Sequence, residues 1–246
     1  MPIEAVTFDW WHTVAETPWP DYDERMRTIR VQGISDELRT AGIETDEASL
    51  YGAYDRLEGR LRETWAHNAD LRSGEQVNAF LEYAGLRDRG DLHEGIMRAF
   101  GEAMLENMPI LQPHIADTLA GLKADGYRIG MVSNTGRTWG RFLRQVQDRL
   151  GIAGYFDVRV FSDEVEIRKP GRGIFERALA ALGVKPATAV HVGDDVEADV
   201  AGARGVGIRA IWYNNGSSSA ADATGADAVI RDFAELPPLL RSWRTA

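Results

Sequence analysis

Three polar residues, Asp9, Ser133 and Asp194, each come at the end of a short apolar segment of the sequence. A carboxylate can attack phosphorus or carbon to form a covalent intermediate, which divides one difficult displacement into two easier ones. This role suits Asp9. Lys169 would add a positive charge, and the Ser133 hydroxyl with the backbone N–H groups of residues 134–136 would bind phosphoryl oxygens. Asp9 is therefore the predicted nucleophile, and Ser133 and Lys169 are predicted catalytic residues.

Two of these residues can also bind a metal ion. Asp9 and Asp194, with a backbone carbonyl group, supply the hard oxygen ligands that Mg²⁺ prefers, while water and a substrate phosphate complete its octahedron. Such an ion lets an anionic nucleophile approach an anionic phosphate. Asp199, five residues after Asp194, is a candidate for holding a metal-bound water or for orienting Lys169.

Each of these residues also has a purely structural interpretation. An aspartate at the end of a strand often caps the following helix, which applies to Asp9, Asp194 and Asp195 alike. A lysine beside an arginine, as at position 169, is usually a solvated surface charge, and residues 133–136 have the composition of a turn. Only their positions relative to the predicted strands favour the catalytic interpretation.

The elements that must position these residues are apolar segments alternating with helical patterns. Short buried strands in such an alternation predict an α/β fold with a parallel, doubly wound sheet, in which ligands bind beyond the carboxyl ends of the strands. Helical stripes that begin at Ile115 and Ile174 stop at Gly126 and Gly183, where glycine favours a helix end. The predicted strands are residues 3–8, 128–132, 158–161, 189–192, 208–212 and 228–230.

Residues 21–108 follow a different pattern, with several helical stripes and no convincing strand. Apolar residues three or four positions apart predict helices, and the prolines at positions 18, 20 and 109 mark the borders because proline resists helix continuation. The simplest architecture is an α/β core of residues 1–17 and 109–246 that carries a helical cap of residues 18–108. The serines of residues 217–219 are predicted to lie in a surface loop.

Composition narrows the classes of partner. Asp and Glu outnumber Lys and Arg by 38 to 28, and the resulting net charge of −10 opposes binding to nucleic acid or to anionic membranes. The absence of cysteine excludes disulfides, thiolate catalysis and cysteine-ligated zinc. No apolar run approaches the ~20 residues that cross a bilayer, and the first residues do not read as a secretory signal. We expect a cytoplasmic monomer or homodimer that acts on a small anionic molecule.

Four motifs of the sequence resemble, in order, those of the haloacid dehalogenase-like (HAD) superfamily. They are residues 9–14, 133–136, 168–170 and 193–199. The resemblance implies a Rossmann-like, Mg²⁺-dependent hydrolase in which Asp9 is the nucleophile and Ser133 binds a phosphoryl oxygen. It further implies that Lys169 steadies the nucleophile and substrate and that Asp194 binds Mg²⁺. The helical insert corresponds to the cap that this family places between its first two motifs.

The first motif departs from the phosphatase form of the family at Trp11. Phosphatases have there a second aspartate, which protonates the leaving group, whereas an indole N–H is not acidic near neutral pH. The metal ligand at this position is a backbone carbonyl, which Trp11 still supplies. His12 stands where the family usually has glycine and is a candidate replacement donor, because imidazole titrates near neutral pH.

The predicted substrate-binding residues are Trp11, His12, Asn134 and Thr135. Asn134 and Thr135 belong to the loop expected to hold the phosphoryl group. Trp10, Trp11 and Trp19 suggest an aromatic wall near the cap entrance, which would suit an organic substrate of apolar or ring character, with packing of Trp10 in the core as the alternative.

Three functions fit the missing acid, and we rank them in the following order. A phosphatase can act on a substrate with a good leaving group, such as an aryl or acyl phosphate, or use another proton donor. A 2-haloacid dehalogenase of this family carries an aromatic residue at the position of Trp11 and needs no acid, but the metal-free dehalogenases lack an aspartate at the position of Asp194. A catalytically impaired binding protein comes third, because Asp9, Ser133, Lys169 and Asp194 are all retained. Phosphonate cleavage is a poor fit because residues 21–107 contain no lysine for a Schiff base.

Overall fold

All six predicted strands are present, and together they form one parallel sheet. The computed structural model describes residues 2–216 and 225–245, so the predicted loop at residues 217–219 lies outside the described residues. The strand order across the sheet is β5 (Val158–Phe161), β4 (Arg128–Ser133), β1 (Ala5–Phe8), β6 (Ala189–Gly193), β7 (Arg209–Tyr213) and β8 (Ala228–Ile230). Every residue of β1 and β6 is buried, as expected for central strands covered on both faces.

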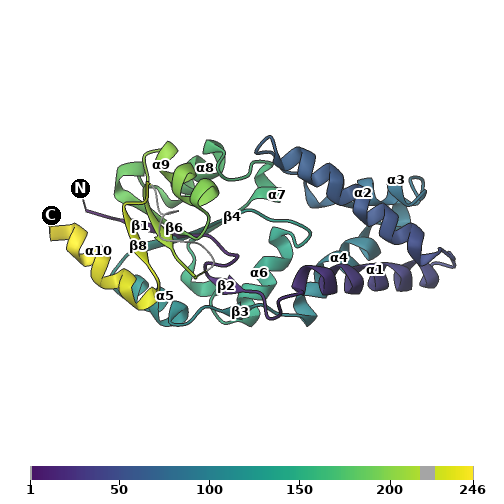
Figure 1. The fold of residues 1–246 in the computed structure, drawn as a ribbon, viewed down its shortest axis with the longest axis horizontal. Helices are drawn as coiled ribbons and strands as arrows, with labels where there is room; N and C mark the ends of the chain where they lie inside the picture. The colour runs from purple at the N-terminus through teal and green to yellow at the C-terminus, as the bar shows by residue number, and fades with distance from the viewer. Residues whose placement is uncertain (1, 217–224, 246) are drawn as a thin grey trace.

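Helices cover both faces of this sheet, which confirms the doubly wound α/β prediction. Figure 1 shows α8 (Arg172–Leu182) and α9 (Gly202–Gly205) on one face and α5 (Ile115–Ala124) and α10 (Leu236–Thr245) on the other. The stripes predicted to stop at Gly126 and Gly183 are α5 and α8, and both glycines have a positive φ. The remaining helices near the sheet are α6 (Gly140–Arg149), α7 (Ser162–Val165) and the π-helix η4 (Val196–Ala201), with short 3₁₀ turns η2 (Ala153–Tyr155), η3 (Pro186–Thr188) and η6 (Phe233–Glu235).

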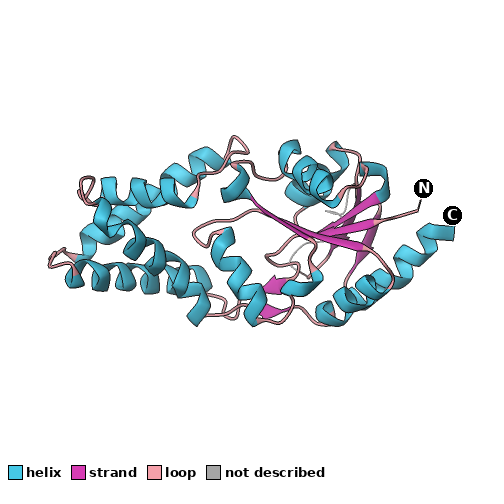
Figure 2. Cartoon of the chain, turned by 180° about the vertical axis from the view of Figure 1, so that it is seen from behind, coloured by secondary structure: helices cyan, strands magenta, loops and turns pink. Residues whose placement is uncertain are grey.

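Residues 21–108 form a region of helices beyond one end of the sheet, here called the helical region (Figures 1 and 2). Its elements are α1 (Tyr22–Thr40), α2 (Glu47–Trp65), α3 (Ser73–Tyr83), η1 (Gly90–Leu92) and α4 (His93–Glu106). All residues of this range are described, and they contain no strand apart from a single bridge residue, Ala69. Among all described residues, no helix combines the length and apolar character required to span a membrane.

Aromatic side chains form one of the contacts between the helical region and the rest of the chain. The rings of Phe100 of α4 and Trp139 are tilted by 35° with centroids 5.5 Å apart, and Trp139 in turn contacts Phe142 of α6. Close to the predicted borders, β2 (Ala15–Glu16) and β3 (Ile110–Leu111) form an antiparallel pair. The sequence did not predict this pair because two-residue strands carry no periodic pattern.

Candidate active site

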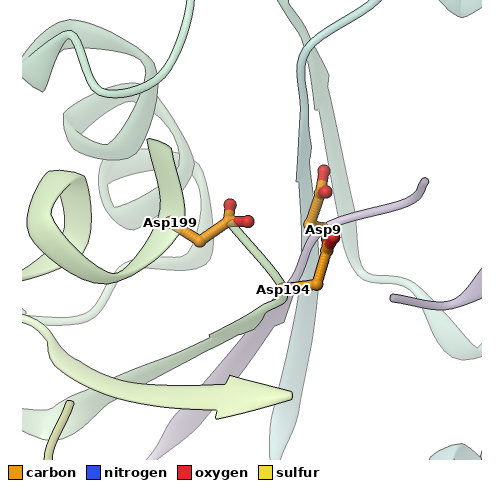
Figure 3. Close-up of side chains that lie close together, drawn as sticks. All are labelled: Asp9, Asp194 and Asp199. Carbon is orange, nitrogen blue, oxygen red and sulfur yellow. The ribbon is translucent and has the colours of Figure 1, made fainter. Parts of the chain in front are cut away.

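The topology brings the predicted site residues to one edge of the sheet. Strand β1 lies between β4 and β6, so Asp9 after β1, Ser133 at the end of β4 and Asp194 after β6 lie at neighbouring carboxyl ends. Figure 3 shows Asp9, Asp194 and Asp199 side by side, and each offers a carboxylate oxygen within 4.8 Å of the other two. These three residues and Lys169 are called the carboxylate cluster below.

Lys169 lies between two of these carboxylates. Its Nζ is 2.6 Å from Asp9 Oδ1 and 2.6 Å from Asp199 Oδ1, and its side chain is buried. Burial disfavours the ammonium, but Asp199 and Asp9 outweigh this effect and raise the pKa of Lys169. Asn134 holds the Lys169 backbone, because its Oδ1 accepts from the Lys169 N–H at 2.8 Å and its Nδ2 donates to the Lys169 carbonyl at 3.0 Å.

Asp199 has both of its carboxylate oxygens occupied. Oδ1 contacts Lys169 and lies 3.0 Å from His191 Nε2, while Oδ2 accepts from the Asp195 N–H at 3.1 Å. Burial opposes ionisation, yet Lys169 and His191 lower the pKa of Asp199 to about 2. The side chain approaches Gly193 so closely that a Cβ there would lie 2.2 Å from it, so glycine is required. Of the two roles predicted for Asp199, these contacts favour orienting Lys169.

His191 supports this carboxylate from the neighbouring strand β6. Burial lowers the pKa of His191, which favours the neutral ring. Because the ionised Asp199 can only accept a hydrogen bond, the hydrogen is on Nε2, and Nδ1 accepts from the Thr7 hydroxyl at 2.9 Å. The hydrogen-bonded chain therefore runs from Thr7 through His191 and Asp199 to Lys169 and Asp9.

The charges of the carboxylate cluster do not balance. When ionised, three carboxylates face one ammonium, which leaves two negative charges in excess. Burial, together with Asp199 and Asp194, raises the pKa of Asp9 to about 7. Burial and Asp199 raise the pKa of Asp194 to about 6. A hard divalent cation would relieve this repulsion, so the oxygen donors and their charge fit a metal site.

Asp194 is fixed by two neighbours and borders the loop that follows Asp9. Its Oδ1 accepts from the Thr13 hydroxyl at 2.9 Å, and its carbonyl accepts from Trp212 Nε1 at 2.8 Å. The backbone of the loop turns through hydrogen bonds to the Trp10 and Ala15 carbonyls. The carbonyl of Trp11, predicted as a metal ligand, takes no part in these bonds.

Trp11 and His12 face a cavity, whereas Trp10 does not. Trp10 is fully buried and belongs to the core, as its packing alternative predicts. His12 has a φ of 57°, which explains why glycine suits this position, and its Nδ1 lies 2.8 Å from Glu16 Oε1. The cavity has a volume of about 600 Å³ and is lined by residues of both the sheet loops and the helical region.

A second buried polar cluster connects the helical region to the loops of the site. Asp70, between α2 and α3, accepts from Ser162 Oγ at 2.5 Å, from Arg168 Nη1 at 2.9 Å and from Trp65 Nε1 at 3.0 Å. Thr135 joins it through its hydroxyl, 3.0 Å from Ser162 Oγ, and through its N–H, 2.8 Å from the same oxygen. We call Asp70, Arg168, Ser162 and Thr135 the Asp70 cluster.

These contacts change the interpretation of the second motif. Thr135 lines the cavity, but its hydroxyl and N–H bind Ser162 and so are not free to bind a substrate in this structure. The side chain of Asn134 likewise holds Lys169 rather than facing a ligand. Asp195 caps η4 by accepting from the N–H groups of Glu197 and Ala198, as its structural interpretation predicts.

Three residues of the site were not predicted from the sequence. Thr13 lies within the first motif, four residues after Asp9, so its position was a usable signal. His191 is a polar residue inside an otherwise apolar strand, which was another. Asp70 carried no signal, because its partners Ser162 and Arg168 lie 92 and 98 residues further along the chain.

Comparison with known proteins identifies relatives for most of the chain. A family model described as haloacid dehalogenase-like hydrolase matches residues 3–207. A glyceraldehyde 3-phosphate phosphatase of Methanothermobacter thermautotrophicus is 38% identical over 135 residues, which are 52% of this chain and 58% of that protein. For two further phosphatases, the chain likewise spans only about half of their length, 52% and 50%.

Solved structures match over nearly the whole chain. A 2-haloacid dehalogenase from Pseudomonas syringae pv. Tomato is 28% identical with a TM-score of 0.69, and the match covers 98% of this chain and 99% of that one. A HAD phosphatase from Thermococcus onnurineus is 26% identical with a TM-score of 0.61, covering 97% and 98%.

Proposed function

The chain belongs to the haloacid dehalogenase-like hydrolase family, and from this premise we propose that it is a Mg²⁺-dependent phosphatase of a small phosphorylated metabolite. The observation that carries the proposal is the charge imbalance of the carboxylate cluster, in which three carboxylates, of which Asp9 and Asp199 are buried, lie beside one lysine. A metal-dependent phosphatase needs such an excess, because the cation it attracts also neutralises the substrate phosphate. The phosphatases among the relatives support the same reaction.

In this proposal, Asp9 attacks the phosphorus atom, and the bond to the leaving-group oxygen breaks. The product is an aspartyl-phosphate on Asp9, which water then hydrolyses to release phosphate and regenerate the carboxylate. Lys169, 2.6 Å from Asp9, offsets the charge of the nucleophile, and the Ser133 hydroxyl binds a phosphoryl oxygen. Mg²⁺, held by Asp9, Asp194 and the Trp11 carbonyl, would supply the positive charge that lets the two anions approach.

The leaving group cannot receive a proton from Trp11. Aryl and acyl phosphates release a stable anion without a proton, so we expect them to be the better substrates. For alkyl esters, His12 is the candidate donor, since it lines the cavity and an imidazole can donate near neutral pH. The helical region, as a cap formed by residues 18–108, would select the organic part of the substrate.

A second candidate is a 2-haloacid dehalogenase with Asp9 as its nucleophile. The indole of Trp11 and the similarity to the solved 2-haloacid dehalogenase favour it. Against it is the same charge imbalance, because an uncompensated excess of carboxylate would repel the carboxylate of a haloacid.

The two candidates are separated by one assay. The purified protein is incubated with p-nitrophenyl phosphate and, in parallel, with a 2-haloacid, each with Mg²⁺ and with EDTA. Phosphate release that requires Mg²⁺ and disappears in Asp9→Asn supports the phosphatase. Halide release that persists in EDTA rejects it in favour of the dehalogenase, and no reaction with either substrate favours a binding protein.

A Trp11→Asp variant tests the explanation of the leaving group. If the missing acid limits turnover, phosphate esters with poor leaving groups should gain about 10²-fold or more, and p-nitrophenyl phosphate should gain little. An equal gain or loss for both classes of ester would refute the explanation.

A further inference from the structure

Arg30 of α1 carries a buried positive charge that lacks an anionic partner. The residue is 3% exposed and donates to the Phe100 carbonyl at 3.1 Å, to Tyr54 Oη at 3.3 Å and to Thr138 Oγ1 at 2.8 Å. These acceptors are all uncharged, and no ion pair of Arg30 exists within the described part of the chain. A buried guanidinium is costly unless an anion accompanies it.

Arg137 is a second, weakly paired arginine beside it. Its Nη2 lies 3.5 Å from Asp23 Oδ1, and its buried Nε lies 3.3 Å from Glu58 Oε1 without forming a well-aligned hydrogen bond. The Asp23 side chain is 89% exposed, so water screens its attraction for Arg137. Glu58 is therefore the main anion with which a ligand would compete for this guanidinium.

Both arginines line the cavity that residues of the first two motifs also line. Trp11 and His12 belong to the loop that follows Asp9, Gly136 belongs to the second motif, and Arg30 and Arg137 are part of the same lining. The acidic residues of the lining, Asp21, Asp23 and Glu24, are exposed at its rim. Burial thus separates the charges, with cations inside and anions facing solvent.

We propose that Arg30 and Arg137 form a subsite for a second anionic group of the substrate, a carboxylate or a second phosphate. The inference rests on the proposed phosphatase function, in which the first anion is the phosphoryl group at Asp9. Planar guanidinium groups bind anions that present two oxygens, and a cavity of about 600 Å³ accommodates a small metabolite. The substrate class is a short phosphate monoester with a further acidic group.

Binding of phosphonates, which the enzyme does not hydrolyse, tests the subsite without turnover. We would titrate the full chain, with Mg²⁺ present, with propylphosphonate, 3-phosphonopropionate and propane-1,3-diyl bisphosphonate in a calorimeter. A second anion should raise the affinity about 10-fold to 100-fold over propylphosphonate, as for a charge-assisted hydrogen bond. The larger gain of the two identifies the second group as carboxylate or phosphate.

Variants of the two arginines test whether they cause the increase in affinity for a second anion. Arg137→Gln should abolish the preference for a second anion, and Arg30→Lys, which keeps the buried positive charge but removes the guanidinium, should weaken it. The control is Arg25→Gln, an exposed arginine of the same helix paired with Asp21, which should keep the preference. Equal affinity of wild type for all three phosphonates, or an unchanged preference in Arg137→Gln, overturns the inference.

A parallel turnover assay keeps the two proposals apart. The specificity constants for propyl phosphate and for the phosphate ester of 3-hydroxypropionate are compared, since both have alkyl leaving groups. A binding preference that is present while no ester or aryl phosphate is hydrolysed rejects the phosphatase and retains the anion subsite. Hydrolysis without any preference retains the phosphatase and rejects the subsite.

Discussion

The carboxylate cluster and the Asp70 cluster are both buried groups of charged residues, but their charges are arranged differently. In the carboxylate cluster, Lys169 is the one cation among three carboxylates. In the Asp70 cluster, one carboxylate faces one guanidinium, and Ser162 and Trp65 add neutral donors. The first has an excess of negative charge, whereas in the second the Asp70 carboxylate is paired with Arg168 and accepts from further donors.

This difference separates a binding function from a structural one. Burial, together with the neighbouring carboxylates, raises the pKa of Asp9 and Asp194, which is typical of groups arranged for a ligand or for chemistry. A balanced and fully hydrogen-bonded cluster instead fixes the relative position of the segments that it joins. Under the proposed function, the excess of negative charge, in addition to burial, marks the place where the chemistry would occur.

The largest expected effect is on activity, from Asp194→Asn in the unbalanced cluster. Mg²⁺ binding loses a carboxylate ligand, so we expect the specificity constant for p-nitrophenyl phosphate to fall about 10³-fold. Stability of the protein in EDTA should not fall, because one of the repelling charges has been removed. The specificity constant is measured at pH 8 by phosphate release, and the stability in EDTA is measured at the same pH by thermal unfolding. A clear loss of stability in EDTA would contradict the imbalance.

Asp70→Asn should have the opposite profile. It leaves the Arg168 charge without its buried partner, so the free energy of unfolding should fall by about 3 kcal/mol, measured by urea denaturation. Activity of the folded protein should change less than about tenfold. The control is Arg72→Gln, which breaks the exposed Arg72–Glu166 ion pair between the same two segments and should cost under about 1 kcal/mol. Equal losses in the free energy of unfolding for the two variants would show that the Asp70 cluster does not fix the position of the segments that it joins.

A smaller effect is expected from Thr13→Val, which removes a neighbour of the unbalanced cluster. Asp194 loses the hydrogen bond that orients it, so Mg²⁺ affinity should fall about 10-fold to 100-fold, as for other residues behind a metal ligand. Thr118→Val is matched to it, since Thr118 is also buried but donates to the Phe233 carbonyl. It should lower stability by about 1 kcal/mol and leave Mg²⁺ affinity unchanged in a calorimetric titration. A similar loss of affinity in both variants would rule out a specific role for Thr13.

The last expected effect concerns pH. The pKa values of about 7 for Asp9 and about 6 for Asp194 are raised above the ordinary value of 3.8, so protons compete with Mg²⁺ for both carboxylates. Apparent Mg²⁺ affinity should be constant above pH 8 and fall by about tenfold per unit between pH 7 and 6, and more steeply below. A titration series from pH 5.5 to 8.5 measures it. Affinity that stays constant over this range would mean that both groups are ionised throughout.

The parts of the fold that were predicted are those with local patterns. Strand β4 and helix α8 are long enough for apolar periodicity and a terminal glycine to mark them, and the buried strand β1 ends at the aspartate of the first motif. The pairing of β2 with β3 has no such pattern, because it depends on contact between residues far apart in the sequence, such as Glu16 and Ile110, which are 94 positions apart.

The candidate site divides in the same way. Asp9, Lys169 and Asp199 were identified as a group, and the structure brings them into contact. The residues that support the carboxylate cluster were not identified from the sequence. Thr13, for example, contacts Asp194 across 181 positions of sequence. Thr135 was predicted to bind substrate from its place in a motif, but which of its groups are free depends on Ser162, in another segment.

The β2–β3 pair also has a consequence for how this architecture can be altered. Glu16 and Ile110 are directly paired, so the chain leaves the core and returns to it at adjacent points, about 5 Å apart between Cα atoms. A linker of a few residues would close that gap. The segment between β2 and β3 can therefore be replaced by one of a different size without a change in the connections of the sheet. The β2–β3 pair is thus a point at which the inserted segment can change, and with it the substrate specificity, while the residues of the sheet that carry the proposed chemistry stay the same.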